Sequence, residues 1–147
     1  MSEFSIRAFR PDDTAAVIDL WVECDLVVPW NNPETDIQRK QQDSSEMFFV
    51  GEIDAELMAS CMAGYDGHRG WIYFMAVRQA QRGNGFASRM VEHAERELKK
   101  LGCPKVELLV RNRNIGVMEF YTSIGYAQEP VTVLSKRLIE DAEHNFG

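Results

Sequence analysis

Residues Val77–Ala87 read VRQAQRGNGFA and join an uncharged run, Trp71–Val77, to a longer stretch of mixed apolar and charged residues. The uncharged run is aromatic and β-branched over most of its length, as in a strand covered on both faces. In the longer stretch, apolar residues recur every three or four positions, which predicts an amphipathic helix that Gly102 and Pro104 end. These apolar residues are Ala87, Met90, Val91, Ala94, Leu98 and Leu101. The junction therefore predicts a central strand, a loop and a helix.

The loop between this strand and helix has the features of a phosphate-binding turn. Gly83 and Gly85 allow backbone conformations closed to other residues and let a ligand approach closely. The N–H groups of residues 83–88 then lie unpaired at the positive end of the helix dipole, and Arg82 adds a positive charge. A dinucleotide-binding fingerprint fits poorly, because Ser88 stands at its third glycine position. We expect a pyrophosphate group to bind here.

Length and composition limit the remaining possibilities. The 147 residues, 45% apolar and 27% charged, fit one globular domain spanning 1–147. A formal net charge of −7 argues against nucleic acid as a partner, and it suits either the attraction of a cationic amine or solubility alone. The chain has neither an apolar run of about 18 residues nor a signal peptide at residues 1–10, so we expect a cytoplasmic protein with no membrane partner.

The cysteines and histidines predict neither a disulfide framework nor a metal site. Both sets are odd in number and widely separated, without the spacing of zinc ligands. They are Cys24, Cys61, Cys103, His68, His93 and His144.

The other segments predict a mixed α/β fold. Along the chain we expect a β-α-α-β-β-β-α-β-α-β-β order that ends in a closing strand pair. The expected strands are 4–9, 47–53, 57–65, 71–77, 105–110, 126–127 and 131–138, and the expected helices are 14–24, 35–42, 87–101 and 115–124. The tail at 140–147 is expected to fray.

The spacing Arg82-x-x-Gly85-x-Ala87 after a strand resembles motif A of the GCN5-related N-acetyltransferase (GNAT) family, and the similarity continues through most of the chain. The resemblance implies the GNAT fold, in which the strand before the loop splays from its neighbour at a bulge and pairs with the pantetheine arm of acetyl-CoA. The positions that match this strand are Met75, Ala76 and Val77, and those that match the pyrophosphate loop are Arg82, Gly83, Asn84, Gly85, Phe86, Ala87 and Ser88. Gln79 and Gln81 depart from the proline and aromatic residue that the family often has there.

A second segment, Asn114-x-x-Val117-x-x-x-Tyr121-x-x-x-Gly125-Tyr126, resembles motif B of the same family. The resemblance implies that the Tyr121 hydroxyl lies beside the thioester sulfur and protonates the departing thiolate. The alternative is that Tyr121 only packs, because it lies on an apolar helical stripe. Asn114 is expected to contact the cofactor or an intervening water, and it is equally suited to cap the helix.

The general base is less well defined. One branch of the family places a glutamate before a Val-Arg step at the end of this strand, but Leu109 stands there in this chain. Glu107, two residues earlier on the same strand face, is our candidate base; its alternative role is to pair with Lys105 or Arg111. Weaker candidates are Tyr73, Asp66 and His68.

Acceptor specificity is expected from the first two helices and the loop that joins them. Trp30 and Asn31 are the candidate substrate-binding residues in that loop, where pocket and core roles are both open for Trp30. Trp21, on an apolar helical face, is expected to lie in the core.

The resemblance implies an acetyl-CoA-dependent N-acetyltransferase that transfers the acetyl group directly to a primary amine, without a metal. A catalytically silent module that binds or senses acyl-CoA is the alternative, because no firm base is present. A structural protein with an empty loop is a weaker alternative. The acceptor class (small molecule, peptide N-terminus or lysine) and the use of longer acyl groups stay open, and so does a homodimer, since many relatives dimerise.

Overall fold

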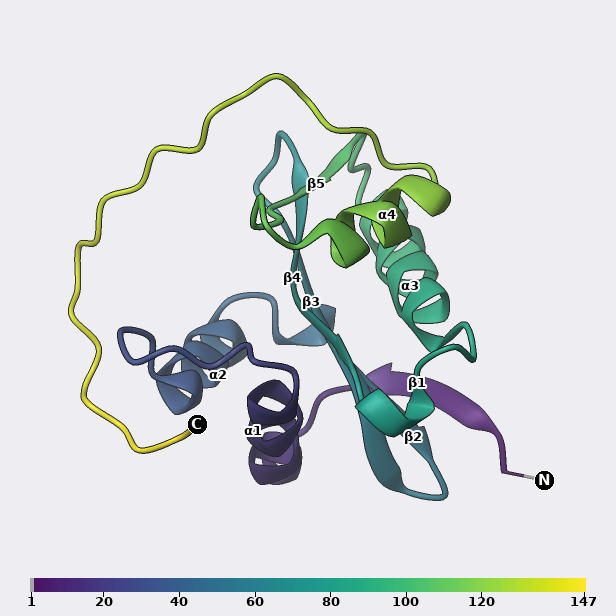
Figure 1. Ribbon diagram of the computed structural model, residues 1–147, viewed down its shortest axis with the longest axis vertical. Helices are drawn as coiled ribbons and strands as arrows, with labels where there is room; N and C mark the ends of the chain where they lie inside the picture. Colours follow the sequence, from purple (N-terminus) through teal and green to yellow (C-terminus); the bar gives the residue numbers. More distant parts are fainter. Residues whose placement is uncertain (1) are drawn as a thin grey trace.

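A mixed β-sheet forms the centre of the molecule in the computed structural model, which describes residues 2–147 (Figure 1). The strands lie in the order β1-β2-β3-β4-β5, and neighbours are antiparallel except β4 and β5, which are parallel. Their bounds are Phe4–Ala8, Phe48–Ile53, Glu56–Tyr65, Gly70–Val77 and Val106–Leu108. The predicted mixed α/β class is confirmed.

Helices cover both faces of the sheet (Figure 1). The helices α1 (Thr14–Glu23) and α2 (Pro33–Gln42) pack on one face around Trp21. The other face is covered by α3 (Phe86–Lys100) and α4 (Ile115–Ser123). The stripe predicted for α3 is buried at Met90, Val91, Ala94 and Leu98, whereas Leu101 beyond the helix end is 54% exposed.

The helix α2 begins at Pro33 rather than at Thr35. The side chain of Asn32 accepts hydrogen bonds from the N–H groups of Glu34 and Thr35, at 3.0 and 3.3 Å, and so caps the helix. Proline suits the first helical position because its missing N–H would have no partner there. The Asn-Pro pair therefore marks the start of the helix.

A bulge interrupts β4 at Phe74. Met62 on β3 pairs with Tyr73, but Ser60 pairs with Ala76, so β4 has one residue more than β3 across this interval. Phe74 has a φ of 50°, in the left-handed region that residues with a side chain rarely occupy. Bulges of this kind bend a strand and increase its local twist.

The strand β5 is shorter than the predicted 105–110, and it diverges from β4. Pairing runs only from Gly70 opposite Val106 to Ile72 opposite Leu108. Within residues 2–147, β4 continues to Val77 without a strand on that side. The two parallel strands therefore open into a gap next to the bulge.

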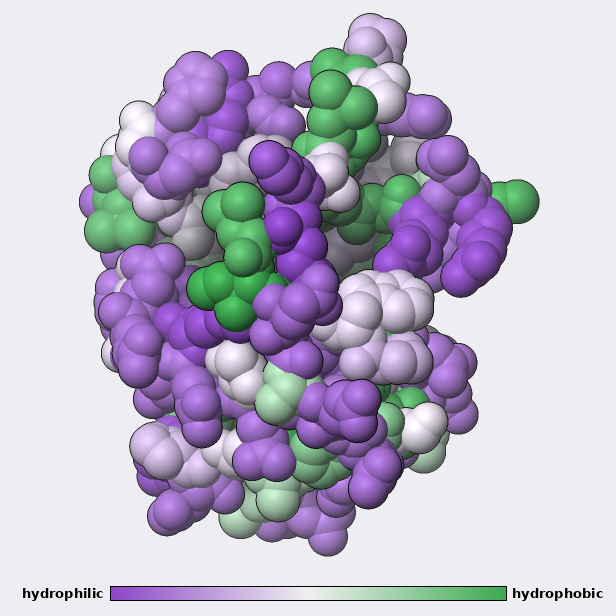
Figure 2. All heavy atoms as spheres, turned by 90° about the vertical axis from the view of Figure 1, so that its left-hand side faces the viewer, coloured by the Kyte–Doolittle hydropathy of each residue, from purple (hydrophilic) through white to green (hydrophobic). Residues whose placement is uncertain are grey.

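The chain after α4 differs from the prediction. Within the described part of the chain, residues 127–147 form no strand, so the predicted closing pair at 126–127 and 131–138 is wrong. These residues, here called the C-terminal arm, run in an extended path around the α1–α2 side of the molecule (Figure 1). Its apolar side chains are largely exposed at Val131, Val133, Leu134, Leu138 and Ile139. Figure 2 shows isolated hydrophobic side chains on this otherwise mainly hydrophilic face.

The end of the C-terminal arm is anchored, so the predicted fraying of 140–147 is also wrong. Asp141 accepts a hydrogen bond from the Asn32 N–H at 2.8 Å and pairs with Arg39 at 2.6 Å. His144 Nε2 lies 2.9 Å from the Val28 carbonyl oxygen, and Phe146 packs on the α1–α2 core. These contacts draw the arm toward α1 and α2, which is the physical reason that its apolar alternation does not become a strand.

Candidate active site

Two buried side chains hold the bulge of β4. Ser60, which is fully buried on β3, donates a hydrogen bond to the Phe74 carbonyl oxygen at 2.9 Å and accepts one from Trp21 Nε1 at 3.0 Å. The Trp21 ring also stacks on the Phe74 ring, with centroids 3.9 Å apart. Trp21 is 0% exposed, which confirms its predicted core position. The strained residue is therefore fixed by a hydrogen bond and by stacking.

The free edge of β4 lies directly after this bulge. Met75, Ala76 and Val77 have no neighbouring strand on the β5 side among the described residues. Backbone groups on such an edge can pair with an extended ligand in the manner of an added strand. Part of this edge is already used, because the Val77 carbonyl oxygen accepts a hydrogen bond from Arg82 Nε at 3.3 Å.

The loop after β4 has the backbone conformation predicted for a phosphate cradle. Gly83 and Gly85 have φ angles of 85° and 76°, in the left-handed region. A Cβ at either position would meet no atom within 4 Å, so both glycines face open space. The first backbone hydrogen bond at the start of α3 joins the Arg89 N–H to the Gly85 carbonyl at 3.2 Å. The N–H groups of residues 86–88 precede it and point out of the helix end, where an anion is stabilised.

The side chains of the loop shape its backbone. Asn84 Nδ2 donates a hydrogen bond to the Gln81 carbonyl oxygen at 3.0 Å, and the Phe86 ring stacks on Phe4 with centroids 4.1 Å apart. Arg82 is exposed and lies against the end of β4 through its bond to Val77. The predicted contacts of these residues with a pyrophosphate stay predictions.

Tyr121 is held in the core beside the opened end of the sheet. Its side chain is 7% exposed and packs against Phe120 and Tyr126, with ring centroids 4.9 and 5.4 Å away. Burial raises the pKa of the Tyr121 hydroxyl well above its usual range, so the group keeps its proton. Within residues 2–147, no group forms a hydrogen bond with this hydroxyl. By contrast, the Tyr126 hydroxyl donates to Glu95 at 2.7 Å.

Asn114 and Glu107 both have partners within the protein. The Asn114 side chain accepts a hydrogen bond from the Val117 N–H at 3.3 Å and caps α4. Glu107 pairs with Arg69 at 3.3 Å, rather than with Lys105 or Arg111. A cofactor contact for Asn114 and a base role for Glu107 stay predictions.

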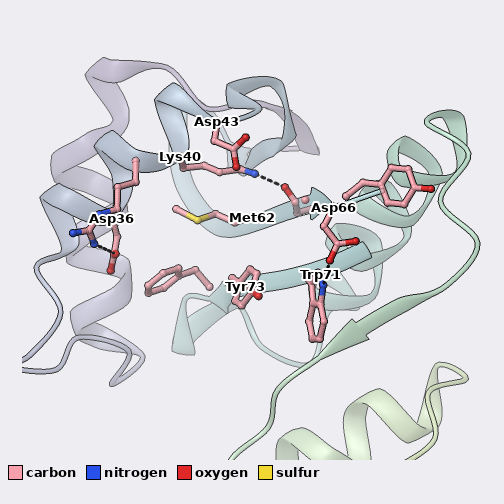
Figure 3. A pocket seen from close by; sticks show the side chains of 12 residues that line it. Asp36, Lys40, Asp43, Met62, Asp66, Trp71 and Tyr73 are labelled. Carbon is pink, nitrogen blue, oxygen red and sulfur yellow. Dashed lines mark hydrogen bonds and ion pairs between the residues drawn. The ribbon is translucent and has the colours of Figure 1, made fainter. Parts of the chain in front are cut away.

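A cavity of about 470 Å³ lies between α2 and the β3–β4 hairpin (Figure 3). We call it the α2–β4 cavity. Its lining ends at Phe74, where the free edge of β4 begins, and therefore adjoins the proposed cofactor strand. The residues that line it are Asp36, Arg39, Lys40, Asp43, Met62, Ala63, Gly64, Tyr65, Asp66, Trp71, Tyr73 and Phe74.

Comparison with known proteins identifies the family. The family model described as acetyltransferase (GNAT) family matches residues 14–126. An acetyltransferase of Pectobacterium atrosepticum is 45% identical over 139 residues, covering 95% of this chain and 99% of the relative. The chain belongs to the GNAT family.

Solved structures agree with this assignment at the level of the fold. A putative acetyltransferase from Agrobacterium tumefaciens has a TM-score of 0.73 at 22% identity, covering 90% of this chain and 99% of that one. An aminoglycoside N-acetyltransferase in complex with CoA has a TM-score of 0.75 at 14% identity, covering 94% and 97%. The GNAT fold predicted from the sequence is therefore confirmed, and this GNAT protein is an acetyl-CoA-dependent acetyltransferase.

Residues 2–147 of this acetyltransferase contain neither a membrane-spanning helix nor a cluster of metal-binding side chains. None of its helices has the length and apolar character needed to cross a membrane. No group of three or more His, Cys, Asp or Glu side chains in this range is arranged to hold a metal ion.

The predicted acceptor residues do not line the α2–β4 cavity. Trp30 is 56% exposed and lies beside the C-terminal arm, and the Asn31 side chain accepts a hydrogen bond from Arg137. Their substrate role stays a prediction. Sequence reasoning missed Ser60 and Asp43; the available signal for Ser60 was a lone serine within the apolar run Leu57–Ala63.

Proposed function

We propose that this acetyltransferase moves the acetyl group of acetyl-CoA directly to the primary amine of an acceptor bound in the α2–β4 cavity. In this proposal the free edge of β4 at 75–77 pairs with the pantetheine arm, and residues 82–88 bind the pyrophosphate. Tyr121 is the general acid, and Glu107 stays the candidate base. Much of the rate then comes from aligning the thioester with the amine.

The bonds made and broken follow from the chemistry of a thioester. The amine nitrogen attacks the carbonyl carbon and gives a tetrahedral oxyanion, whose collapse breaks the carbon–sulfur bond. The departing sulfur takes the proton of the Tyr121 hydroxyl, and the nitrogen gives up its extra proton to a base or to water. The proton lost by the nitrogen returns to Tyr121 through water, which restores the acid. Because the amine attacks the thioester itself, no covalent acetyl-enzyme forms.

The observation that carries the proposal is the opening of β4 from β5 beside the cradle. The unpaired edge, the bulge at Phe74 and the outward N–H groups of α3 follow one another along a single stretch of chain, residues 73–88. The arrangement of this stretch favours a site for an extended ligand that ends in a pyrophosphate over a surface loop that binds no ligand. The free thiols at Cys24, Cys61 and Cys103 also support the proposed cytoplasmic location, where thiols stay reduced.

Thermal melting with acetyl-CoA tests the cofactor site. Ligand at a hundred times its dissociation constant adds about 2.7 kcal/mol to the free energy of unfolding, so the melting temperature should rise by several degrees. Gly85→Glu places a side chain and a negative charge in the cradle and should abolish the rise. No rise for the unaltered protein at saturating acetyl-CoA would contradict the proposal.

Gly102→Glu is the matched control. Gly102 has a φ of 86° and open space around its Cβ position, but it lies at the other end of α3. This variant introduces the same backbone strain and charge and should keep the acetyl-CoA shift. Release of free thiol on addition of amines, with mass spectrometry of the product, then distinguishes a transferase from a silent acyl-CoA-binding module.

A further inference from the structure

The α2–β4 cavity has an aromatic wall on its β4 side. Trp71 and Tyr73 lie on β4 with nearly parallel rings, at an interplanar angle of 20° and centroids 6.5 Å apart. Tyr73 is 47% exposed, although it lies on a strand in the middle of the molecule. Figure 3 shows Tyr73 and Trp71 along β4, with Trp71 bonded to Asp66. The faces of such rings attract cations.

The positive side chains at the cavity already have partners. Arg39 pairs with Asp36 at 3.3 Å and with Asp141 of the C-terminal arm at 2.6 Å. The Lys40 ammonium group donates a hydrogen bond to the Ala63 carbonyl oxygen, and burial lowers its pKa. Arg39 is thus committed to two carboxylates, whereas Lys40 is bonded to a neutral carbonyl and keeps its charge at the cavity.

Two carboxylates at the cavity lack a positive partner. Among residues 2–147, neither Asp43 nor Asp66 has a side-chain nitrogen of lysine, arginine or histidine within 4.0 Å. Asp66 accepts hydrogen bonds from the N–H groups of His68 and Arg69 and from Trp71 Nε1, which hold its carboxylate beside the aromatic wall. In Figure 3, Asp43 and Asp66 approach the cavity from α2 and from the β3–β4 hairpin. The lining groups without an ion pair are then Lys40, Asp43 and Asp66, and two carboxylates against one ammonium group leave the cavity with a net negative charge.

A cation in this cavity is a different group from the amine that reacts. The attacking nitrogen needs its lone pair, so it must be neutral when it meets the thioester. The cavity extends from Asp43 and Asp66 to Phe74, next to the proposed cofactor strand. A molecule that spans this length places one end at the carboxylates and the other near the thioester.

We propose that the acceptor is a small amine with a second group that is positively charged at neutral pH, which binds between the Trp71–Tyr73 wall and the carboxylates of Asp43 and Asp66. This inference rests on the proposed transfer to an amine and adds the class of its substrate. The two carboxylates and the aromatic faces select the charged end, and the neutral end reacts.

Three probes of matched length test this selection: 1,4-diaminobutane, butylamine and 4-aminobutanoate, with thiol release as the readout. Loss of a cation–π contact and a charge pair should lower kcat/KM about tenfold or more for butylamine relative to the diamine. The 4-aminobutanoate should be the poorest, because its carboxylate would face Asp43 and Asp66. Equal rates for butylamine and the diamine, or preference for 4-aminobutanoate, would overturn the inference.

Variants link the preference to the cavity. Asp43→Asn and Asp66→Asn remove charge while their amides keep the shape, and the amide oxygen introduced by Asp66→Asn can still accept the turn hydrogen bonds. The double variant should reduce the diamine-to-butylamine ratio of kcat/KM toward one, whereas the charge-matched control Asp54→Asn, in the β2–β3 turn, should keep it. A ratio that survives in the double variant contradicts the assigned cavity.

The same experiment separates the two levels of the proposal. Turnover of butylamine without a diamine preference contradicts the substrate class alone and leaves transfer to an amine intact. Absence of thiol release with all three probes contradicts both, and the acetyl-CoA melting shift then shows independently whether the cofactor site stands.

Discussion

Tyr121 and Tyr126 lie side by side in the core, yet their hydroxyls have different surroundings. The Tyr126 hydroxyl donates to Glu95, so its proton is committed to a neighbour within the fold. The Tyr121 hydroxyl has no such partner in residues 2–147, although its ring is almost fully buried. The Tyr121 hydroxyl oxygen itself is not enclosed, so it reaches the surface of the core with its proton uncommitted, as the proposed general acid requires.

Tyr121→Phe is expected to lower kcat about a hundredfold and leave the KM for acetyl-CoA nearly unchanged. Only the hydroxyl is removed, so ring packing and cofactor contacts remain while the leaving sulfur loses its proton donor. Steady-state kinetics measure both constants. Tyr126→Phe is the control, because it loses the Glu95 bond and some stability without a loss of kcat. An unchanged kcat in Tyr121→Phe would reduce Tyr121 to a packing residue.

At the scale of the element, β4 is a strand with a conformation that its own sequence does not favour. The left-handed φ of Phe74 persists because β3 and α1 hold it through Ser60 and Trp21. Both groups are buried, so loss of either partner leaves a donor or acceptor unpaired, at a cost of about 1–3 kcal/mol. The geometry of the proposed cofactor strand thus depends on two residues outside that strand, Ser60 and Trp21.

Ser60→Ala is expected to raise the KM for acetyl-CoA by more than it changes kcat, and to lower the melting temperature. The bulge relaxes when Phe74 loses its hydrogen bond, and the backbone groups of residues 75–77 move out of register with the cofactor. Val17→Ala, a buried change in the same core that makes no bond to β4, should lower the melting temperature alone. Equal effects of both variants on KM would refute a positioning role for Ser60.

Local features of this fold are predictable from the sequence, because residues near in the chain decide them. The backbone of the cradle is predictable from Gly83 and Gly85. The buried stripe of α3 is predictable from the spacing of its apolar residues, and the start of α4 from the capping residue Asn114. The Trp21–Ser60 bond joins residues far apart in the chain, and no short pattern encodes such a pair. The α2–β4 cavity likewise combines a polar helix with two strands, and its acidic residues resemble any solvated turn when considered singly.

At the scale of the whole molecule, the C-terminal arm connects its far end to the loop between α1 and α2. Asp141 is the centre of this connection, since it binds the Asn32 backbone and Arg39, which also pairs with Asp36 at the α2–β4 cavity. The hydrogen bond from Arg39 and that from Asn32 hold the pKa of the Asp141 carboxyl below its usual range. The same site raises the pKa of Asp36, through burial and the nearby charge of Asp141.

The Asp141 contact should make part of the stability depend on pH. Because folding lowers the pKa of the Asp141 carboxyl, its contribution to stability is fully present above the unfolded pKa of about 3.9. That contribution is lost as the pH falls through the lower pKa of the folded state. Asp141→Asn should therefore lower the melting temperature at pH 7 by roughly 2–4 °C. The difference from the unaltered protein should shrink toward pH 3, as followed by circular dichroism. A difference that stays constant with pH would contradict the charge-based anchor.

The connection between Asn32 and Asp141 also bears on the order in which the molecule is completed. The two residues are separated by 109 positions, so closing this contact costs much chain entropy before it returns any stability. The sheet and α3 use shorter separations and can form before residues 141–146 are available during synthesis. The α1–α2 loop gains its final hydrogen bonds only when residues 141–146 are released. The α1–α2 loop therefore gains these contacts after the sheet and α3 have formed.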